Sequence, residues 1–152
     1  MKRNALMVLG LGMAIALVAA GCGGGSDDSD NALSKSEFLA KGNAICDAGN
    51  KEIQTAFEDA IGKGQPTQEQ LDAVVTASLV PSIQGQVDDI RDLGAPEGDD
   101  GQIGKILDEA ELAVQDVKEN PSLATQEGGQ SPFADVNQQL KEYGLTTCAD
   151  SE

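Results

Sequence analysis

The segment LDAVVTASLVPSIQGQVDDIRDL, residues 71–93, decides the fold class of this chain. Its apolar side chains recur every three or four residues, a spacing that places them on one face of an α-helix. They are Leu71, Val75, Leu79, Ile83, Val87 and Ile90. Pro81 lies within the segment, has no amide hydrogen to donate and clashes with the preceding turn. We therefore expect an amphipathic helix that is kinked near Val80, or two helices that meet there.

A helix with the same pattern precedes this segment. Ser34-Lys35-Ser36-Glu37 has the spacing of a capping box, which predicts a helix start. Apolar residues then recur at helical spacing: Phe38, Ile45, Ile53, Phe57 and Ile61. Gly42 and Gly49 fall within this helix, and each lowers its intrinsic helix propensity. Residues 62–66, GKGQP, end the helix, and the next one begins near Thr67.

Two more helices are expected after residue 94. Asp99 or Asp100 caps a helix that ends at Asn120-Pro121, and Ser131-Pro132 starts a shorter one that Gly144 ends. Four amphipathic segments with short connections predict an all-α fold, a small bundle of about four helices. We place this helical domain at residues 34–152.

The first 21 residues predict an export signal. Residues 1–4 are basic, residues 5–20 are almost wholly apolar, and small residues precede Cys22. A short apolar stretch of this kind is typical of a secretory signal peptide rather than a spanning helix. The cysteine at the cleavage site predicts a lipoprotein, in which a diacylglyceryl group on Cys22 supplies the two chains that stable anchoring needs. The alternative is an ordinary cleaved signal followed by an unrelated cysteine.

Export also bears on the rest of the chain. Residues 22–33 are rich in Gly, Ser and Asp and predict a flexible tether behind the lipidated Cys22. The protein is then expected at the cell membrane, on its extracytoplasmic face. Cys46 and Cys148 would meet an oxidising environment there, so we expect a disulfide that closes the bundle; two free thiols are the alternative.

The residue types that are missing narrow the chemistry. The chain has no His and no Trp, and its three Met residues, Met1, Met7 and Met13, lie in the signal. Once the signal is removed, Cys22 is lipidated and Cys46 and Cys148 are bridged, we expect none of the usual ligands of zinc, copper and haem to remain, and the lack of His excludes every His-dependent catalytic arrangement. The net charge of −16 argues against binding to nucleic acid, whose phosphates it repels. We expect no cofactor and no enzymatic activity.

Three groups of residues could still form a binding site. Ser26, Asp28, Asp30, Ser34 and Glu37 follow the spacing of a calcium loop. A spacer and a helix cap explain the same residues, and Ser rather than Asp holds the first position. Acidic patches at residues 88–92 and 99–100 could bind a cation or a basic partner, or simply face solvent. The apolar stripes could enclose a cavity for an apolar ligand, or pack as an ordinary core.

Short motifs resemble those of small actinobacterial lipoproteins of unassigned function. Besides the lipobox and the acidic spacer, they are Ala44-Ile45-Cys46 with Asn50, Leu93-Gly94-Ala95-Pro96 and Tyr143-Gly144-Leu145-Thr146-Thr147-Cys148. The resemblance implies an exported helical domain held by the cysteine pair and implies no activity. We therefore expect a non-enzymatic binding or interaction module that contacts a protein partner in the cell envelope. The alternatives are a carrier of a small apolar ligand and, less favoured, an enzyme that uses paired carboxylates.

Overall fold

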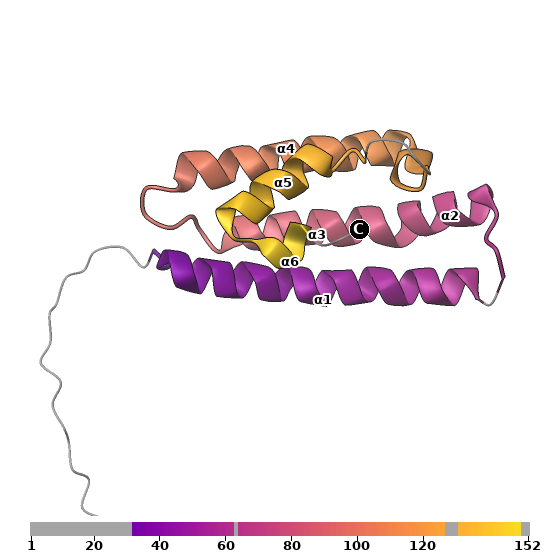
Figure 1. Cartoon of the computed structure of the whole chain (residues 1–152), viewed down its shortest axis with the longest axis horizontal. Helices are drawn as coiled ribbons and strands as arrows, with labels where there is room; N and C mark the ends of the chain where they lie inside the picture. Colours follow the sequence, from indigo (N-terminus) through magenta and orange to yellow (C-terminus); the bar gives the residue numbers. More distant parts are fainter. Residues whose placement is uncertain (1–31, 63, 127–130, 150–152) are drawn as a thin grey trace, which may run out of the picture. The chain divides into compact units, whose positions relative to one another are not determined.

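The computed structural model describes residues 32–62, 64–126 and 131–149, which belong to one compact unit, Asn31–Glu152. Every regular element in those ranges is helical, so the predicted all-α class is confirmed (Figure 1). The elements are α1 (Lys35–Ile61), α2 (Gln68–Val74), η1 (Val75–Leu79), α3 (Val80–Asp92), α4 (Asp100–Glu119), η2 (Pro121–Ala124), α5 (Ala134–Tyr143) and α6 (Thr146–Ala149).

The predicted capping box opens α1. The Ser34 hydroxyl accepts from the Glu37 backbone amide at 3.3 Å, and the Glu37 carboxylate accepts from the Ser34 amide at 3.0 Å. Two orphan amides of the first turn are thereby satisfied. The helix runs for 27 residues and ends at Gly62, which has a φ of +59°. A second capping box, between Thr67 and Gln70, opens α2.

The irregularity predicted at Pro81 is present, and it is a π-helical turn. α2, η1 and α3 follow one another without a loop, and η1 immediately precedes the proline turn. The Val80 amide donates to the Val75 carbonyl, five residues back. A wider turn of this kind changes the hydrogen-bond ladder just before Pro81, where an ordinary α-helix would leave a carbonyl without its donor.

The C-terminal part of the chain differs from the sequence prediction in two places. Ser131 and Pro132 precede α5 rather than beginning it, because the Ser131 hydroxyl and carbonyl accept from the amides of Phe133 and Ala134. Gly144, with a φ of +112°, ends α5 as predicted. The short helix α6 then follows, which apolar spacing did not predict because it is only four residues long.

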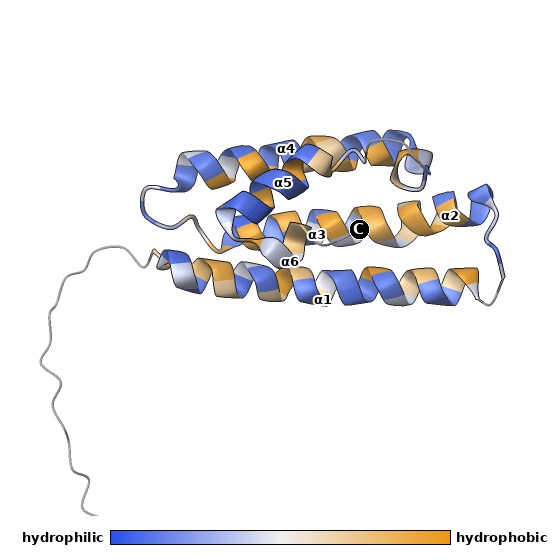
Figure 2. Ribbon diagram, viewed as in Figure 1, coloured by the Kyte–Doolittle hydropathy of each residue, from blue (hydrophilic) through white to orange (hydrophobic). Residues whose placement is uncertain are grey.

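The helices pack in a simple order. α3 contacts both α1 and α4, α5 packs on α4 and α6, and α6 packs on α1 (Figure 1). α3 packs between α1 and α4 and is apolar over much of its length, whereas the visible face of α5 is largely polar (Figure 2). The largest fully buried side chains in the described residues include Phe38, Ile106 and Leu145. Phe38 belongs to α1, Ile106 to α4 and Leu145 to the link between α5 and α6, so the core forms only when these three parts of the chain come together.

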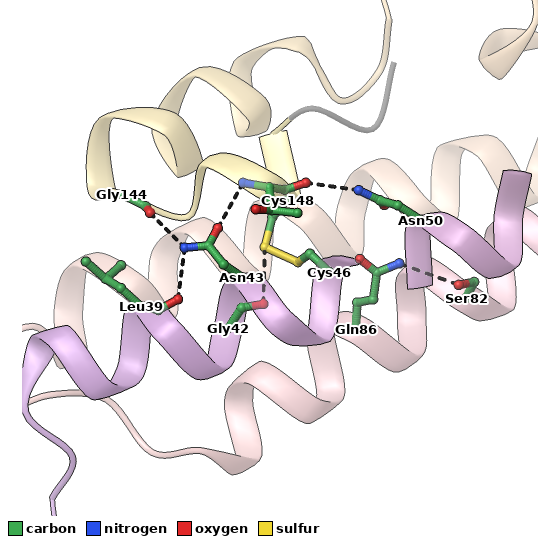
Figure 3. The surroundings of a disulfide bond; sticks show 10 residues. Leu39, Gly42, Asn43, Cys46, Asn50, Ser82, Gln86, Gly144 and Cys148 are labelled. Atoms are coloured by element: carbon green, nitrogen blue, oxygen red, sulfur yellow. Dashed lines mark hydrogen bonds between the residues drawn. A yellow bond between two sulfur atoms is a disulfide. The ribbon is translucent and has the colours of Figure 1, made fainter. Parts of the chain in front are cut away.

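The predicted disulfide joins Cys46 of α1 to Cys148 of α6, with their Cα atoms 5.0 Å apart (Figure 3). Both cysteines are buried. Asn43 supports the junction: its Nδ2 donates to the carbonyl of Gly144 at 3.1 Å, and its Oδ1 accepts from the Thr147 amide at 2.8 Å. α6 is therefore fixed to α1 by one covalent bond and by hydrogen bonds on either side of it.

The two glycines of α1 allow close packing there. A Cβ on Gly42 would come within 2.6 Å of Leu145 Cδ2, and one on Gly49 would clash with the side chain of Gln86. Both glycines are buried. Their cost in helix propensity is therefore offset by the close approach of α1 to its neighbours.

Candidate functional site

The described part of the chain contains an apolar pocket of about 950 Å³. α1 contributes Ile53, Phe57 and Ile61 to its wall. Leu79, Ile83 and Phe133 line it from the other elements. We call this hollow the apolar pocket. Small-molecule sites in proteins commonly measure about 300–1,000 Å³ and are lined mainly by apolar and aromatic side chains.

The pocket exists because the apolar stripe of α1 is longer than the elements that cover it. The hydrogen bonds and the disulfide that join the segment from Gly144 to Cys148 to α1 involve Asn43, Cys46 and Asn50 of that helix. α1 continues from there to Ile61, with α2 and η1 beside it. The sequence indicated this stripe and assigned it to the core. It did not indicate that the half beyond Asn50 would remain only half-buried and form one wall of a hollow.

Polar groups are few at this pocket. Gln54 and Glu58 lie on α1, and Gln54 Nε2 donates to Glu58 Oε1 at 2.9 Å. Asn50 and Ser131 also contribute to the wall. Among the described residues that line the pocket, Glu58 is the only charged one, and none is Lys or Arg.

Asn50 connects the pocket to the disulfide region. Its Nδ2 donates to the Thr147 carbonyl at 3.0 Å (Figure 3), while its Oδ1 is buried and accepts no hydrogen bond from the residues that the structure describes. A buried acceptor without a donor costs free energy. The contact between α1 and α6 thus carries a polar group that is only partly satisfied, next to the wall of the apolar pocket.

A second hollow, of about 520 Å³, lies between α4 and α5 and has a different character. Four carboxylate side chains line it, those of Glu109, Asp116, Asp135 and Glu142. Leu112 also lines it and is 60% exposed. Its charged wall makes it unsuited to an apolar ligand.

The predicted lipidation and calcium residues are mostly beyond the reach of the structure. Cys22, Ser26, Asp28 and Asp30 lie outside the described residues, as do the signal peptide and most of the tether. Ser34 and Glu37, the last two residues of the calcium spacing, bond to each other in the helix cap instead. Within the described ranges, no group of three or more His, Cys, Asp or Glu is arranged to hold a metal ion.

The acidic patches divide into exposed and engaged carboxylates. Asp88, Asp89 and Asp92 of α3 are exposed. Asp99 stands at the N-cap position of α4, but its side chain does not cap the helix as we had expected. Instead, its Oδ2 lies 3.0 Å from Lys35 Nζ and accepts from the Tyr143 hydroxyl at 2.9 Å.

Asp99 therefore ties together three distant parts of the chain. Lys35 is the first residue of α1, Tyr143 is the last residue of α5, and Lys35 Nζ also lies 4.0 Å from the centre of the Tyr143 ring. Hydrogen bonds from Lys35 and then from Tyr143 lower the pKa of Asp99. Burial, and the carboxylate of Asp99 beside the phenol, raise the pKa of Tyr143. We interpret this cluster as a structural contact, since both partners of the carboxylate are used in holding helix ends together.

Among the described residues, every carboxyl group with a perturbed pKa has a lowered one. The pKa values of Glu37, Asp99 and Glu109 are all lowered, by the hydrogen bonds that Ser34, Lys35 and Gln139 respectively give them. A general acid of the kind expected in a carboxylate-based enzyme needs a raised pKa. These three groups do not provide one.

No known protein family, curated protein or solved structure matches this chain. None of the helices that the structure describes is both long enough and apolar enough to span a membrane. Among the features of the described residues, the apolar pocket is the one best suited to binding a ligand.

Proposed function

We propose that this protein is a non-enzymatic binding module, anchored by a lipid on Cys22 at the extracytoplasmic face of the cell membrane, and that it holds a small apolar ligand in the apolar pocket. The pocket is the observation that supports this proposal. Of the two binding roles expected from the sequence, protein contact and ligand carriage, it favours ligand carriage. Nothing comparable in the described residues selects a particular protein partner.

The chemistry of the wall supports an apolar ligand. Ile53, Phe57 and Leu79 are half-buried, so each keeps apolar surface in contact with water. A ligand that covers such surface gains about 25 cal/mol for every Å² of apolar area removed from water. Two of the three phenylalanines of the chain, Phe57 and Phe133, face this one hollow. Aromatic residues at that density are more typical of a ligand site than of an exposed surface.

The binding test fills the pocket. Ala124 lies in its wall, and Ala124→Trp should occupy the space that a ligand needs. Ala77 is exposed on η1 and is not part of the wall, so Ala77→Trp is the matched control. We expect the neutral fluorophore N-phenyl-1-naphthylamine to bind the wild type and Ala77→Trp with similar affinity. Ala124→Trp should weaken that binding at least tenfold.

Equal binding by all three proteins would place the fluorophore elsewhere and refute the pocket as the site. Circular dichroism and thermal unfolding of each variant establish that it is folded. Native mass spectrometry of the protein, gently purified from its own host, tests for a natural ligand. Extra bound mass in the wild type that is missing from Ala124→Trp would support ligand carriage.

The anchor has its own test. Cys22→Ala removes the thiol that would carry the diacylglyceryl group, so we expect the protein to be released or to persist as an uncleaved precursor. Fractionation of the cells and the mass of the protein distinguish these outcomes. Mature, membrane-bound protein in the Cys22→Ala strain would contradict the anchor while leaving the pocket unaffected.

A further inference from the structure

The charges around the apolar pocket carry an inference about the class of its ligand. We propose that the pocket takes a small apolar molecule whose polar group is uncharged, such as an alcohol or an amide, and that it discriminates against the ionised fatty acid of the same chain length. This inference rests on the proposed function, because it specifies the ligand of the same pocket.

The described residues of the pocket wall supply no positive charge that could pair with an anionic head group. An ionised carboxylate that leaves water needs a cation or several hydrogen-bond donors, and otherwise its transfer is costly. Glu58 is the one charged residue among the described residues of the wall, and it is negative. Sites for anionic ligands usually place Arg or Lys at the head group, since these side chains satisfy it by charge-assisted hydrogen bonds.

The other polar groups of the described wall are uncharged. Asn50, Gln54 and Ser131 contribute neutral amide and hydroxyl groups to the wall. Such groups exchange hydrogen bonds with an alcohol or an amide without transferring a charge out of water. The side chain of Gln54 already donates to Glu58, so the amide and the carboxylate lie together on one turn of α1.

The net charge of the whole chain also disfavours an anionic ligand. With 26 acidic and 10 basic residues, the protein carries a net charge of −16, which repels anions before they reach the pocket. This long-range contribution is screened by salt, whereas a charge next to the bound head group is screened less. The two contributions can therefore be separated by experiment.

The experiment compares 1-decanol with decanoate as competitors of N-phenyl-1-naphthylamine, at pH 7, low salt and concentrations below micelle formation. Decanoate is ionised at that pH, and the alkyl chains are matched. We expect the wild type to bind decanol at least tenfold more tightly. Because part of that ratio reflects the solubility of the two compounds, the decisive quantity is how the ratio changes in variants.

Glu58→Gln and Asp59→Asn each remove one negative charge from neighbouring positions of α1. Both side chains are exposed, but Glu58 lines the pocket whereas Asp59 is not part of the wall. We expect Glu58→Gln to reduce the ratio of decanol affinity to decanoate affinity about threefold. This is the factor that corresponds to the repulsion between two like charges about 6 Å apart in water. Asp59→Asn should leave the ratio unchanged. Equal narrowing by both variants would assign the discrimination to net charge and overturn the inference.

Two further outcomes are informative. If decanoate competes as well as decanol in the wild type, or if Lys63→Gln weakens decanoate binding, the pocket accepts anions and the inference is wrong. Lys63 is included because it follows Gly62 of the wall and lies outside the described residues. If the fluorophore itself does not bind to the wild type, the proposed function fails instead.

Discussion

Replacing both Cys46 and Cys148 by alanine removes the covalent link between α1 and α6. The two residues are 102 positions apart, so the disulfide closes a loop that spans nearly all of the described helices. In the chain-entropy treatment, a loop of about 100 residues restricts the unfolded chain enough to stabilise the folded state by about 4.7 kcal/mol. Alanine is preferred to serine at these sites because both are buried, and a buried hydroxyl without a partner would add its own cost.

The size of this effect makes the prediction easy to test. A domain of this length has a net stability of about 6–17 kcal/mol, so the loss is a large fraction of the whole. With an unfolding entropy of about 2.1 cal/mol/K per residue, the melting temperature should fall by roughly 20 °C. α6 is too short to persist alone and should lose its helical structure first.

Thermal unfolding followed by circular dichroism measures this fall directly. The comparison is made in a Cys22→Ser background, so that no third thiol can form a mixed disulfide. Adding a reductant to the parent protein should reproduce the shift, and adding it to the alanine variant should change nothing. A shift below about 5 °C would refute the reasoning, because α6 would then be held by its hydrogen bonds and packing rather than by loop closure.

The remaining predictions concern the contacts between helices. Tyr143→Phe removes the hydroxyl that donates a hydrogen bond to Asp99. It should lower the free energy of unfolding, measured in urea, by about 1 kcal/mol. An unchanged urea midpoint would show that this hydrogen bond contributes nothing to stability. Because the pKa of Asp99 is lower in the folded state than in the unfolded chain, its ionised carboxylate stabilises the fold. This stabilisation is fully present above about pH 5 and is lost as the pH falls below about 4. Asp99→Asn should therefore lose less stability than the wild type on acidification, measured by urea unfolding at pH 6 and pH 3. Gly42→Ala should lower the melting temperature because the new methyl group meets the buried Leu145, at a cost of about 1–3 kcal/mol. Gly85→Ala meets no atom within 4 Å and should raise the stability by about 0.5–1 kcal/mol; the same sign for both glycines would contradict the packing argument.

Local signals in the sequence predicted most helix boundaries. Ser34 with Glu37, Gly62, Asn120 and Gly144 each satisfy or end a helix through atoms that are near in sequence, so their effect does not depend on the rest of the fold. The prediction failed where a distant partner competed for the same group. Asp99 or Asp100 was expected to cap α4; Asp99 is at the N-cap position, but Tyr143 and Lys35 hold its carboxylate.

The pocket shows the same division more clearly. Periodicity identified Ile53, Phe57 and Ile61 as one apolar face, and it assigned them to the core because most such faces are covered. Whether a face is covered depends on the length and the position of the neighbouring helices, which no local pattern contains. α6 is hydrogen-bonded to α1 at Asn50, and apolar residues of α1 beyond that point line the apolar pocket.

By itself, the sequence determined the helical class and the principal helix ends, and it led us to expect the disulfide that the structure shows between Cys46 and Cys148. The helical class and the helix ends follow from a period of 3.6 residues and from hydrogen bonds within a turn. Only the tertiary structure decided which apolar residues are buried and which line a pocket, and which carboxylates are exposed or engaged. Those properties depend on how elements far apart in the chain meet, and that is set by the packing of the whole bundle.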